Sequence, residues 1–315
     1  MRISTSNFYN NTTNQLNELQ SSISNLSTQV STGKKGITPQ DDPAAAVKIL
    51  SLIQVQSMDA QYAKNRVALN NTLGVATSAL DSMLNNLQNI NEEILAAKTG
   101  SYSAQDRATI ATSLKGQLDT MIALANANDG AGNYLFSGFN VANNPTALST
   151  SATTLVGGTP VNYDTYAYNG TDSSAQIQVE TGRTAGLNVT VKDLFGSGSN
   201  NFLDLLSKTI AVMNAPNNTF TEADTALTEL SNSFKSTFDN VLLAQSKVGI
   251  TQNQMVELDI IGTQRSNDTS KVLSSLEDTD YNKALSDLAR QQVQLQAAQK
   301  SFQQISSLSL FNYIN

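Results

Sequence analysis

Residues 62–97 read YAKNRVALNNTLGVATSALDSMLNNLQNINEEILAA, and this stretch decides the fold. Apolar or small residues recur every seven positions along it, which is typical of a helix with one narrow apolar stripe. The two interleaved series are Tyr62, Leu69, Ala76, Met83, Ile90 and Ala97, and Leu73, Leu80, Leu87 and Ile94. Asp42 and Pro43 supply a start signal, because an aspartate caps free amides and a proline is tolerated in the first turn. A helix over residues 43–98 would be roughly 80 Å long, which predicts a rod rather than a globular domain.

The two ends of the chain and its second half carry the same kind of stripe. In the N-terminal stretch the stripe consists of Leu16, Leu19, Ile23, Leu26 and Val30, spaced 3, 4, 3 and 4. The second long stripe is Leu227, Phe234, Val241, Val248 and Met255, spaced by sevens. The final helix, capped by Thr279 or Asp280, contributes Ala284, Leu288, Leu295, Ala298, Phe302, Ile305 and Leu308. Each stripe needs a partner, since an isolated amphipathic helix gains little stability in water.

The middle of the chain loses the helical period. Shorter helices are expected near residues 104–127 and 200–214, and a short strand at 134–136. Between them, residues 141–195 gain glycine, threonine and alternating apolar positions, which predicts a small antiparallel β insertion. Its expected features are a turn at Asn169-Gly170 and alternating strands that carry Ile177 and Val179, and Leu187, Val189 and Val191.

The order of these elements is nearly palindromic. It predicts a mainly α fold: an elongated antiparallel bundle of long heptad-patterned helices with a small inserted antiparallel β domain and adjacent termini. The expected segments are an N-terminal assembly helix and loop (1–42), the N-terminal half of an α rod (43–140), the β insertion (141–195), the C-terminal half of the rod (196–277) and a C-terminal assembly helix (278–315).

The composition excludes several classes of function. The 315 residues include no His, Cys or Trp, so Ser-His-Asp and Cys-His nucleophiles, His/Cys zinc sites, haem ligation by histidine, iron–sulfur clusters and disulfides cannot form within the chain. The net charge, 19 − 26 = −7, argues against binding nucleic acid through phosphates. No apolar run reaches the roughly eighteen residues of a membrane span, and no classical signal peptide is expected. No catalytic, cofactor-binding or metal-binding residue is therefore predicted.

Three weaker candidates for binding or catalysis occur in the sequence. Gly33-Lys34-Lys35 does not fit the spacing of a phosphate-binding loop and reads as a turn. The pairs Asp41-Asp42 and Asp278/Asp280 lack a calcium-loop pattern and suit helix caps. An enzyme on the β insertion stays as a minor alternative, but its carboxylates are scattered over Asp164, Asp172, Glu180 and Asp193.

The two terminal helices are almost uncharged. Between Ile3 and Gly33 the one charged residue is Glu18, and beyond Arg290 it is Lys300. This pattern fits either the polar surface of an ordinary coiled coil or helices that pack on copies of themselves in a polymer, where like charges would repel at every step. In the second case the helices would be poorly ordered before assembly. The candidate assembly interface is Leu16, Leu19, Ile23, Leu26, Val30, Leu288, Leu295, Phe302, Ile305 and Leu308.

Both ends of the chain resemble the flagellin family. Residues 31–44, STGKKGITPQDDPA, are similar to its Ser-x-Gly-basic turn and Asp-Asp-Pro/Ala loop, with mild departures at Lys35 and Gln40. Residues 278–311 resemble the matching C-terminal helix, so the resemblance covers about 1–140 and 196–315. Within the family, GNYLFSGF at 132–139 and LSLFNY at 308–313 are more similar to the hook–filament junction members than to flagellin, the filament subunit, which stays as the alternative.

The resemblance implies a structural, non-enzymatic protein of the bacterial flagellum. Such a protein would leave the cell through the flagellar type III apparatus without a cleaved signal peptide, and it would be extracellular. The implied partners are hook-associated protein 1, flagellin, copies of itself in a helical ring and an export chaperone before secretion, with no nucleic acid, membrane or cofactor.

Overall fold

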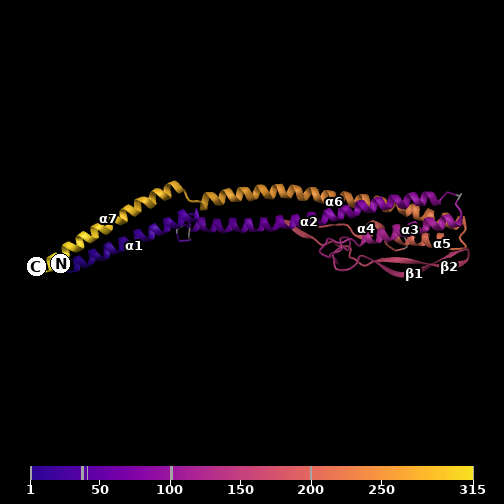
Figure 1. Cartoon of the computed structure of the whole chain (residues 1–315), viewed down its shortest axis with the longest axis horizontal. Coiled ribbons are helices and arrows are strands. Elements are labelled where there is room, and N and C mark those ends of the chain that lie inside the picture. Colours follow the sequence, from indigo (N-terminus) through magenta and orange to yellow (C-terminus); the bar gives the residue numbers. More distant parts are fainter. Residues whose placement is uncertain (1, 37–38, 41, 100–101, 199–200, 315) are drawn as a thin grey trace. The chain divides into compact units, whose positions relative to one another are not determined.

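The computed structural model describes the chain except residues 1, 37–38, 41, 100–101, 199–200 and 315, and except the side chains of 2–6, 8 and 306–314. Its helices and strands follow one another as α1 (Arg2–Thr32), α2 (Pro43–Ala97), α3 (Ala104–Ala125), β1 (Thr146–Val156), β2 (Thr159–Tyr168), β3 (Ile177–Glu180), β4 (Arg183–Ala185), α4 (Val191–Phe195), α5 (Phe202–Asn214), α6 (Phe220–Glu277) and α7 (Tyr281–Ile314) (Figure 1). This mainly α order with a small antiparallel β insertion confirms the predicted fold class.

The chain forms two compact units. The terminal unit consists of Met1–Met58 and Thr263–Asn315, and the central unit consists of Asp59–Gly262. The long helices α2 and α6 contribute residues to both units.

The heptad stripe of α2 forms the core of the central unit. Every residue of both series is buried, from Tyr62 to Ala97, and the α6 positions Leu227, Val241, Val248 and Met255 are buried with them. The two helices run antiparallel, because Arg66 pairs with Asp259 at 3.0 Å while Gln245 donates to Asp81 farther along. The predicted period therefore identified the core-facing side of both long helices.

The β insertion is made of two separate two-stranded antiparallel sheets. Strands β1 and β2 are joined by Gly157-Gly158, whose φ angles of 57° and 77° suit a two-residue hairpin turn. The expected turn at Asn169-Gly170 directly follows the end of β2, but it closes no hairpin, because β2 pairs with β1 and β3 pairs with β4. The expected strand at 134–136 was wrong: Tyr134 makes a single bridge to Asn128 and the chain then turns.

The prediction of a strand that carries Leu187, Val189 and Val191 was wrong. Leu187 and Val189 are buried in an extended segment that is not part of a ladder. Val191 instead opens α4, because Thr190 and Asp193 form a capping box that satisfies the free amides of a helix. Leu187 and Val189 do alternate with polar residues, but they are buried in the core cluster without pairing to another strand.

The β1–β2 ribbon is held at both ends. At its base, Thr146 and Asn126 exchange hydrogen bonds of 3.0 Å. At its turn, the Glu222 carboxylate accepts the Gly157 N–H at 2.7 Å and also caps α6 through Thr219. The hydrogen bonds from Gly157 and Thr219 lower the pKa of Glu222.

Within the terminal unit, backbone hydrogen bonds join the segment after α1 to the segment before α7; we call this contact the clasp. Helix α1 stops at Thr32 because Gly33 takes φ 73°, and α7 starts after Asp280, whose carboxylate accepts the Lys283 N–H at 3.1 Å. Between these helix ends, Lys35 N–H donates to the Glu277 carbonyl at 2.6 Å and Thr279 N–H donates to the Gly33 carbonyl at 2.9 Å.

The Glu222 contact predicts a pH dependence of the ribbon turn. Because the folded-state pKa lies below the ordinary 4.5, this carboxylate contributes stability above pH 4.5 that is lost as the pH falls through the folded-state pKa. The protection factor of the Gly157 amide, its exchange compared with the intrinsic rate at the same pH, should therefore fall in acid in the wild type and should already be low at neutral pH in Glu222→Gln. Glu92→Gln, at an exposed position of α2, is the control, and equal exchange in both variants would contradict the assignment.

The clasp predicts unequal effects of two glycine substitutions. Gly33→Ala and Gly36→Ala both place a side chain at positive φ, a strain of about 1–2 kcal/mol. Only Gly33 carries a clasp carbonyl, and its added Cβ would lie 2.8 Å from the Tyr281 hydroxyl, whereas nothing lies within 4 Å at Gly36. Amide exchange at Thr279 should accelerate in Gly33→Ala and stay unchanged in Gly36→Ala. The same acceleration in both variants would show that the clasp does not depend on Gly33.

Candidate assembly surface

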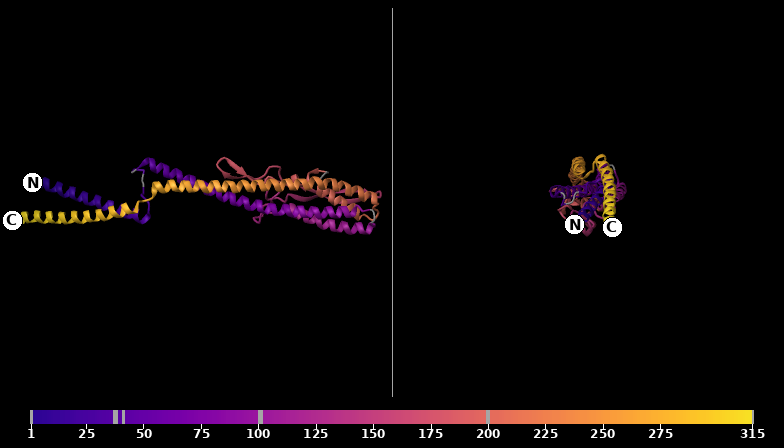
Figure 2. Two further views of the ribbon diagram at one scale, coloured as in Figure 1. Left: turned by 90° about the horizontal axis from the view of Figure 1, so that it is seen from above. Right: turned by 90° about the vertical axis from the view of Figure 1, so that its left-hand side faces the viewer.

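The terminal helices form one antiparallel seam. The half-buried positions of α1 recur with spacings of 3 and 4, and so do those of α7 after the buried Ala284. The positions that follow this spacing are Tyr9, Thr12, Leu16, Leu19, Ile23, Leu26 and Val30 on α1, and Leu288, Gln291, Leu295, Ala298 and Phe302 on α7; Ser22, Gln29 and Asp287 beside them are also half-buried. Helices α1 and α7 run side by side (Figure 2). The rings of Tyr9 and Phe302 meet edge to face, with their centroids 5.5 Å apart.

The structure brings most of the predicted interface residues together. All five predicted residues of α1 lie in this seam, as do Leu288, Leu295 and Phe302 of α7. Ile305 lies outside it with 43% of its surface exposed, and the side chain of Leu308 falls outside the described residues. Their role in assembly stays a prediction.

The seam is only half covered. No described side chain of α1 is buried, whereas the same heptad pattern in the central unit is buried along its length. A helix pair covers each stripe from one side, and water reaches the flanks unless further helices pack there. The surface therefore has apolar contact area left for additional partners.

Other apolar residues of the terminal unit are exposed, and sequence reasoning missed them. Val47, Leu50 and Ile53 face solvent at the start of α2, as do Leu285 and Val293 on α7. The signal in α2 was present, because residues 43–58 are apolar on all sides and include one charge, Lys48. A helix that is apolar all round is expected to be surrounded by protein.

Most charged residues of this unit lie outside α1 and α7, and several of them are paired. Lys34 Nζ lies 2.7 Å from Glu277 Oε2, and this hydrogen bond together with the charge of Glu277 raises the pKa of Lys34. On α7, Arg290 pairs with Asp287 at 2.7 Å. These exposed pairs contribute little to stability. Among the described half-buried side chains of α1 and α7, Asp287 is the one that carries a charge.

The alternative chemistries find no support in the described residues. Gly33-Lys34-Lys35 belongs to the clasp rather than to a phosphate site, and Asp42 caps α2 through Ala45 N–H at 2.9 Å, while Asp41 lies outside the described residues. The backbones of Asp278 and Lys34 form an isolated antiparallel β-bridge in the clasp, and the Asp280 carboxylate caps α7. No group of acidic residues with metal-binding geometry occurs in the described part of the chain.

Each carboxylate of the β insertion lies in a different local environment. Asp172 pairs with Lys192 at 2.8 Å, and Glu180 lies 3.9 Å from Arg183. Asp193 caps α4, and Asp164 lies opposite Ser151 in the ribbon. They do not converge on one point, as acid–base catalysis would require.

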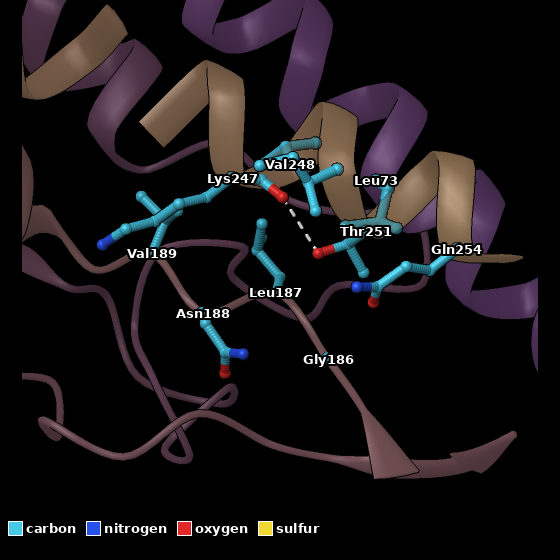
Figure 3. Close-up of a pocket in the computed structure, with 10 residues that line it drawn as sticks. Leu73, Gly186, Leu187, Asn188, Val189, Lys247, Val248, Thr251 and Gln254 are labelled. Atoms are coloured by element: carbon cyan, nitrogen blue, oxygen red, sulfur yellow. Dashed lines mark hydrogen bonds between the residues drawn. The ribbon is translucent and has the colours of Figure 1, made fainter. Parts of the chain in front are cut away.

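A pocket of about 310 Å³ separates the extended segment 186–189 from α6 (Figure 3). Leu187 points toward α6, and the Thr251 hydroxyl donates to the Lys247 carbonyl at 2.9 Å. Lys247 is the one titratable group among its described lining residues, so the pocket holds no acid–base pair.

No helix in the described ranges combines the length and the apolar content that a bilayer crossing requires.

Comparison with known proteins supplies the family. The model for the bacterial flagellin N-terminal helical region matches residues 3–141. Flagellar hook-associated protein 3 of Salmonella typhimurium is 31% identical over 99% of this chain and 99% of its own length. The protein of the same name from Escherichia coli is 30% identical with the same coverage.

Solved structures agree with these relatives. A flagellar hook-associated protein from Vibrio parahaemolyticus, 26% identical, matches with a TM-score of 0.65 over 76% of this chain and 100% of its own. The structure of flagellar hook-associated protein 3 from Legionella pneumophila, 16% identical, shares the fold with a TM-score of 0.61 over 72% of this chain and 98% of its own. With two relatives of at least 30% identity aligned along nearly their whole length, the chain belongs to the flagellar hook-associated protein 3 family.

Proposed function

We propose that this protein is a non-catalytic structural subunit that joins the hook of the bacterial flagellum to its filament, and that the terminal helices are its assembly surface. The observation that carries the proposal is the half-covered seam of α1 and α7, which combines a regular heptad pattern with very few charges. The names of the relatives support the hook-associated assignment over flagellin, the alternative that the motifs left open.

The energetics of the seam favour packing against further helices. Burying the remaining surface of each half-exposed leucine would contribute on the order of 1 kcal/mol, and the seam repeats this at every turn. An uncharged exterior removes the like-charge repulsion that would otherwise recur between copies along a polymer. Both features suit a helix that packs between other helices.

The partners follow from the position of such a subunit. An adaptor between hook and filament contacts copies of itself, hook-associated protein 1 on one side and flagellin on the other. It works outside the cell, and before export its C-terminal helix is bound by a chaperone. Family membership and the exposed apolar residues of α7 support these assignments.

Charge introduced into the seam should block assembly. Leu26→Asp and Leu295→Asp each place a carboxylate where the proposal buries an apolar side chain, so incorporation at the base of the filament should be lost while the central unit stays folded. Motility and electron microscopy of cells expressing each variant measure incorporation, and circular dichroism of the purified chain reports folding. Gln88→Asp, at an exposed position of the central unit, adds the same charge and should assemble normally. Normal filaments from the seam variants would contradict the proposal.

A seeding experiment separates the junction role from that of flagellin. Purified protein added to filament fragments should form at most short caps, because a junction subunit is followed by a different subunit. Flagellin under the same conditions serves as the positive control and should elongate the fragments. Long filaments grown from this chain alone would assign it as a filament subunit instead.

A further inference from the structure

The two edges of the β1–β2 ribbon differ in how they are protected against pairing with another strand. The β2 edge carries Pro160, which has no N–H to donate, and the charged Asp164. Farther along β2, Tyr166 N–H donates to Asp204 Oδ1 at 2.7 Å, and the Tyr166 carbonyl accepts from Asn201 Nδ2 at 3.0 Å. A proline, a charge and a covering helix are the devices that keep an edge strand from pairing.

The β1 edge carries no proline and no charge, and its one bulge, at Ser149, lies outside the stretch Thr150–Val156. Its sequence from Thr146 to Val156, TALSTSATTLV, includes no charge and no proline. Alternate residues of an antiparallel strand direct their N–H and C=O groups away from the partner strand. Among the described residues, no backbone hydrogen bond to β1 comes from a strand other than β2. The outward row of donors and acceptors is therefore available along the middle of β1.

The bare edge is also rigidly presented. The ribbon base is fixed by Asn126 and the turn by Glu222, and Val156 is fully buried against α5 and α6 residues. Because the strand is already extended and fixed at both ends, pairing with another strand pays little ordering entropy. A two-stranded ribbon also gains from a further strand, since it is marginal alone.

The sequence of the edge identifies the strand that fits it. Residues 148–155 read LSTSATTL, which is close to a palindrome. The register of β1 on β2 shifts between Leu148 and Thr150, so Ser149 is the extra residue of a bulge. With that bulge, antiparallel pairing of β1 with itself about Ala152 places Leu148 opposite Leu155. The remaining opposed pairs are then small or hydroxyl residues.

We propose that the β1 edge pairs antiparallel with the β1 edge of a second copy of this chain. The two leucines that would lie opposite each other are 62% and 67% exposed in the single chain, so pairing covers apolar surface at both ends of the contact. The chain as a whole carries −7, but β1 is neutral, so no like charges oppose each other across the pair. Antiparallel pairing points the two copies in opposite directions, so this contact forms between unassembled chains and is independent of the proposed junction role.

A matched pair of substitutions tests the contact in the full chain. Thr153 and Asn162 are cross-strand partners, and their side chains share one hydrogen bond of 2.9 Å. Thr153→Lys and Asn162→Lys therefore lose the same hydrogen bond and add the same charge to the same face of the ribbon. They differ in that only Thr153 lies on the bare edge.

Sedimentation equilibrium over a range of protein concentrations measures self-association, and hydrogen exchange locates it. The wild type should dimerise, with amide exchange at Ser151, Thr153 and Leu155 slowing as concentration rises. Thr153→Lys should weaken dimerisation by about tenfold or more, whereas Asn162→Lys should match the wild type. A monomeric wild type, or equal loss in both variants, would overturn the proposal.

A second variant guards against a folding defect. Thr153→Pro removes one outward N–H while sparing the bonds to β2, so exchange at the inward amides of Ala152 and Thr154 should stay slow while dimerisation is lost. Dimerisation that persists in this variant would place the contact elsewhere. Leu26→Asp should retain β1 pairing, and Thr153→Lys should still enter the junction, so either proposal can fail without the other.

Discussion

The apolar stripe of an amphipathic helix must be covered, and this constraint governs the structure. In the central unit, α2 satisfies it completely, with Leu80, Met83 and Leu87 wholly buried among α3, α5 and α6. In the terminal unit the same repeat leaves Leu19 and Leu295 half-buried, because in the described part of the chain α1 and α7 pack chiefly on each other. One sequence pattern thus yields a finished core in one unit and an incomplete one in the other.

The clasp gives the incomplete seam a defined register. A heptad stripe alone tolerates sliding by one repeat, since the next leucine would occupy the same position. Helix α1 ends at Gly33 and α7 begins after Asp280, and two backbone hydrogen bonds tie these ends together. Tyr9 then faces Phe302 more than twenty residues away along each helix, where their rings meet. The terminal helices are in this way aligned at one end by backbone hydrogen bonds, and side chains such as Tyr9 and Phe302 join them farther along.

The helices could be predicted from the sequence because period, caps and glycine stops are local signals, as Asp42 and Asp280 illustrate. The β insertion could not, because its turn depends on distant contacts. Gly157-Gly158 and Asn169-Gly170 are both plausible turns, and the first closes a hairpin where Glu222 holds it. Likewise Leu187 alternates as a strand residue would, yet it is buried without a ladder. The heptad spacing predicted the seam residues of the assembly surface but not Val47. At the start of α2 apolar residues occur on every side of the helix, so no single stripe stands out in the sequence.

The placement of charge connects these features. A chain of net −7 repels its own copies, so contact between copies is easiest where charge is absent. Two stretches with little or no charge are residues 3–33, where Glu18 is the one charged residue, and residues 130–163, which carry no charge and include the strand Thr146–Val156. The N-terminal helix exposes apolar surface and the strand exposes unpaired backbone N–H and C=O groups. Burial of apolar surface and backbone hydrogen bonding both stabilise contacts between proteins. Charges elsewhere have local tasks, such as the Glu222 cap or the Lys34–Glu277 pair. The absence of charge in these two segments is therefore a positive feature of the sequence, since it leaves each of them able to meet another chain.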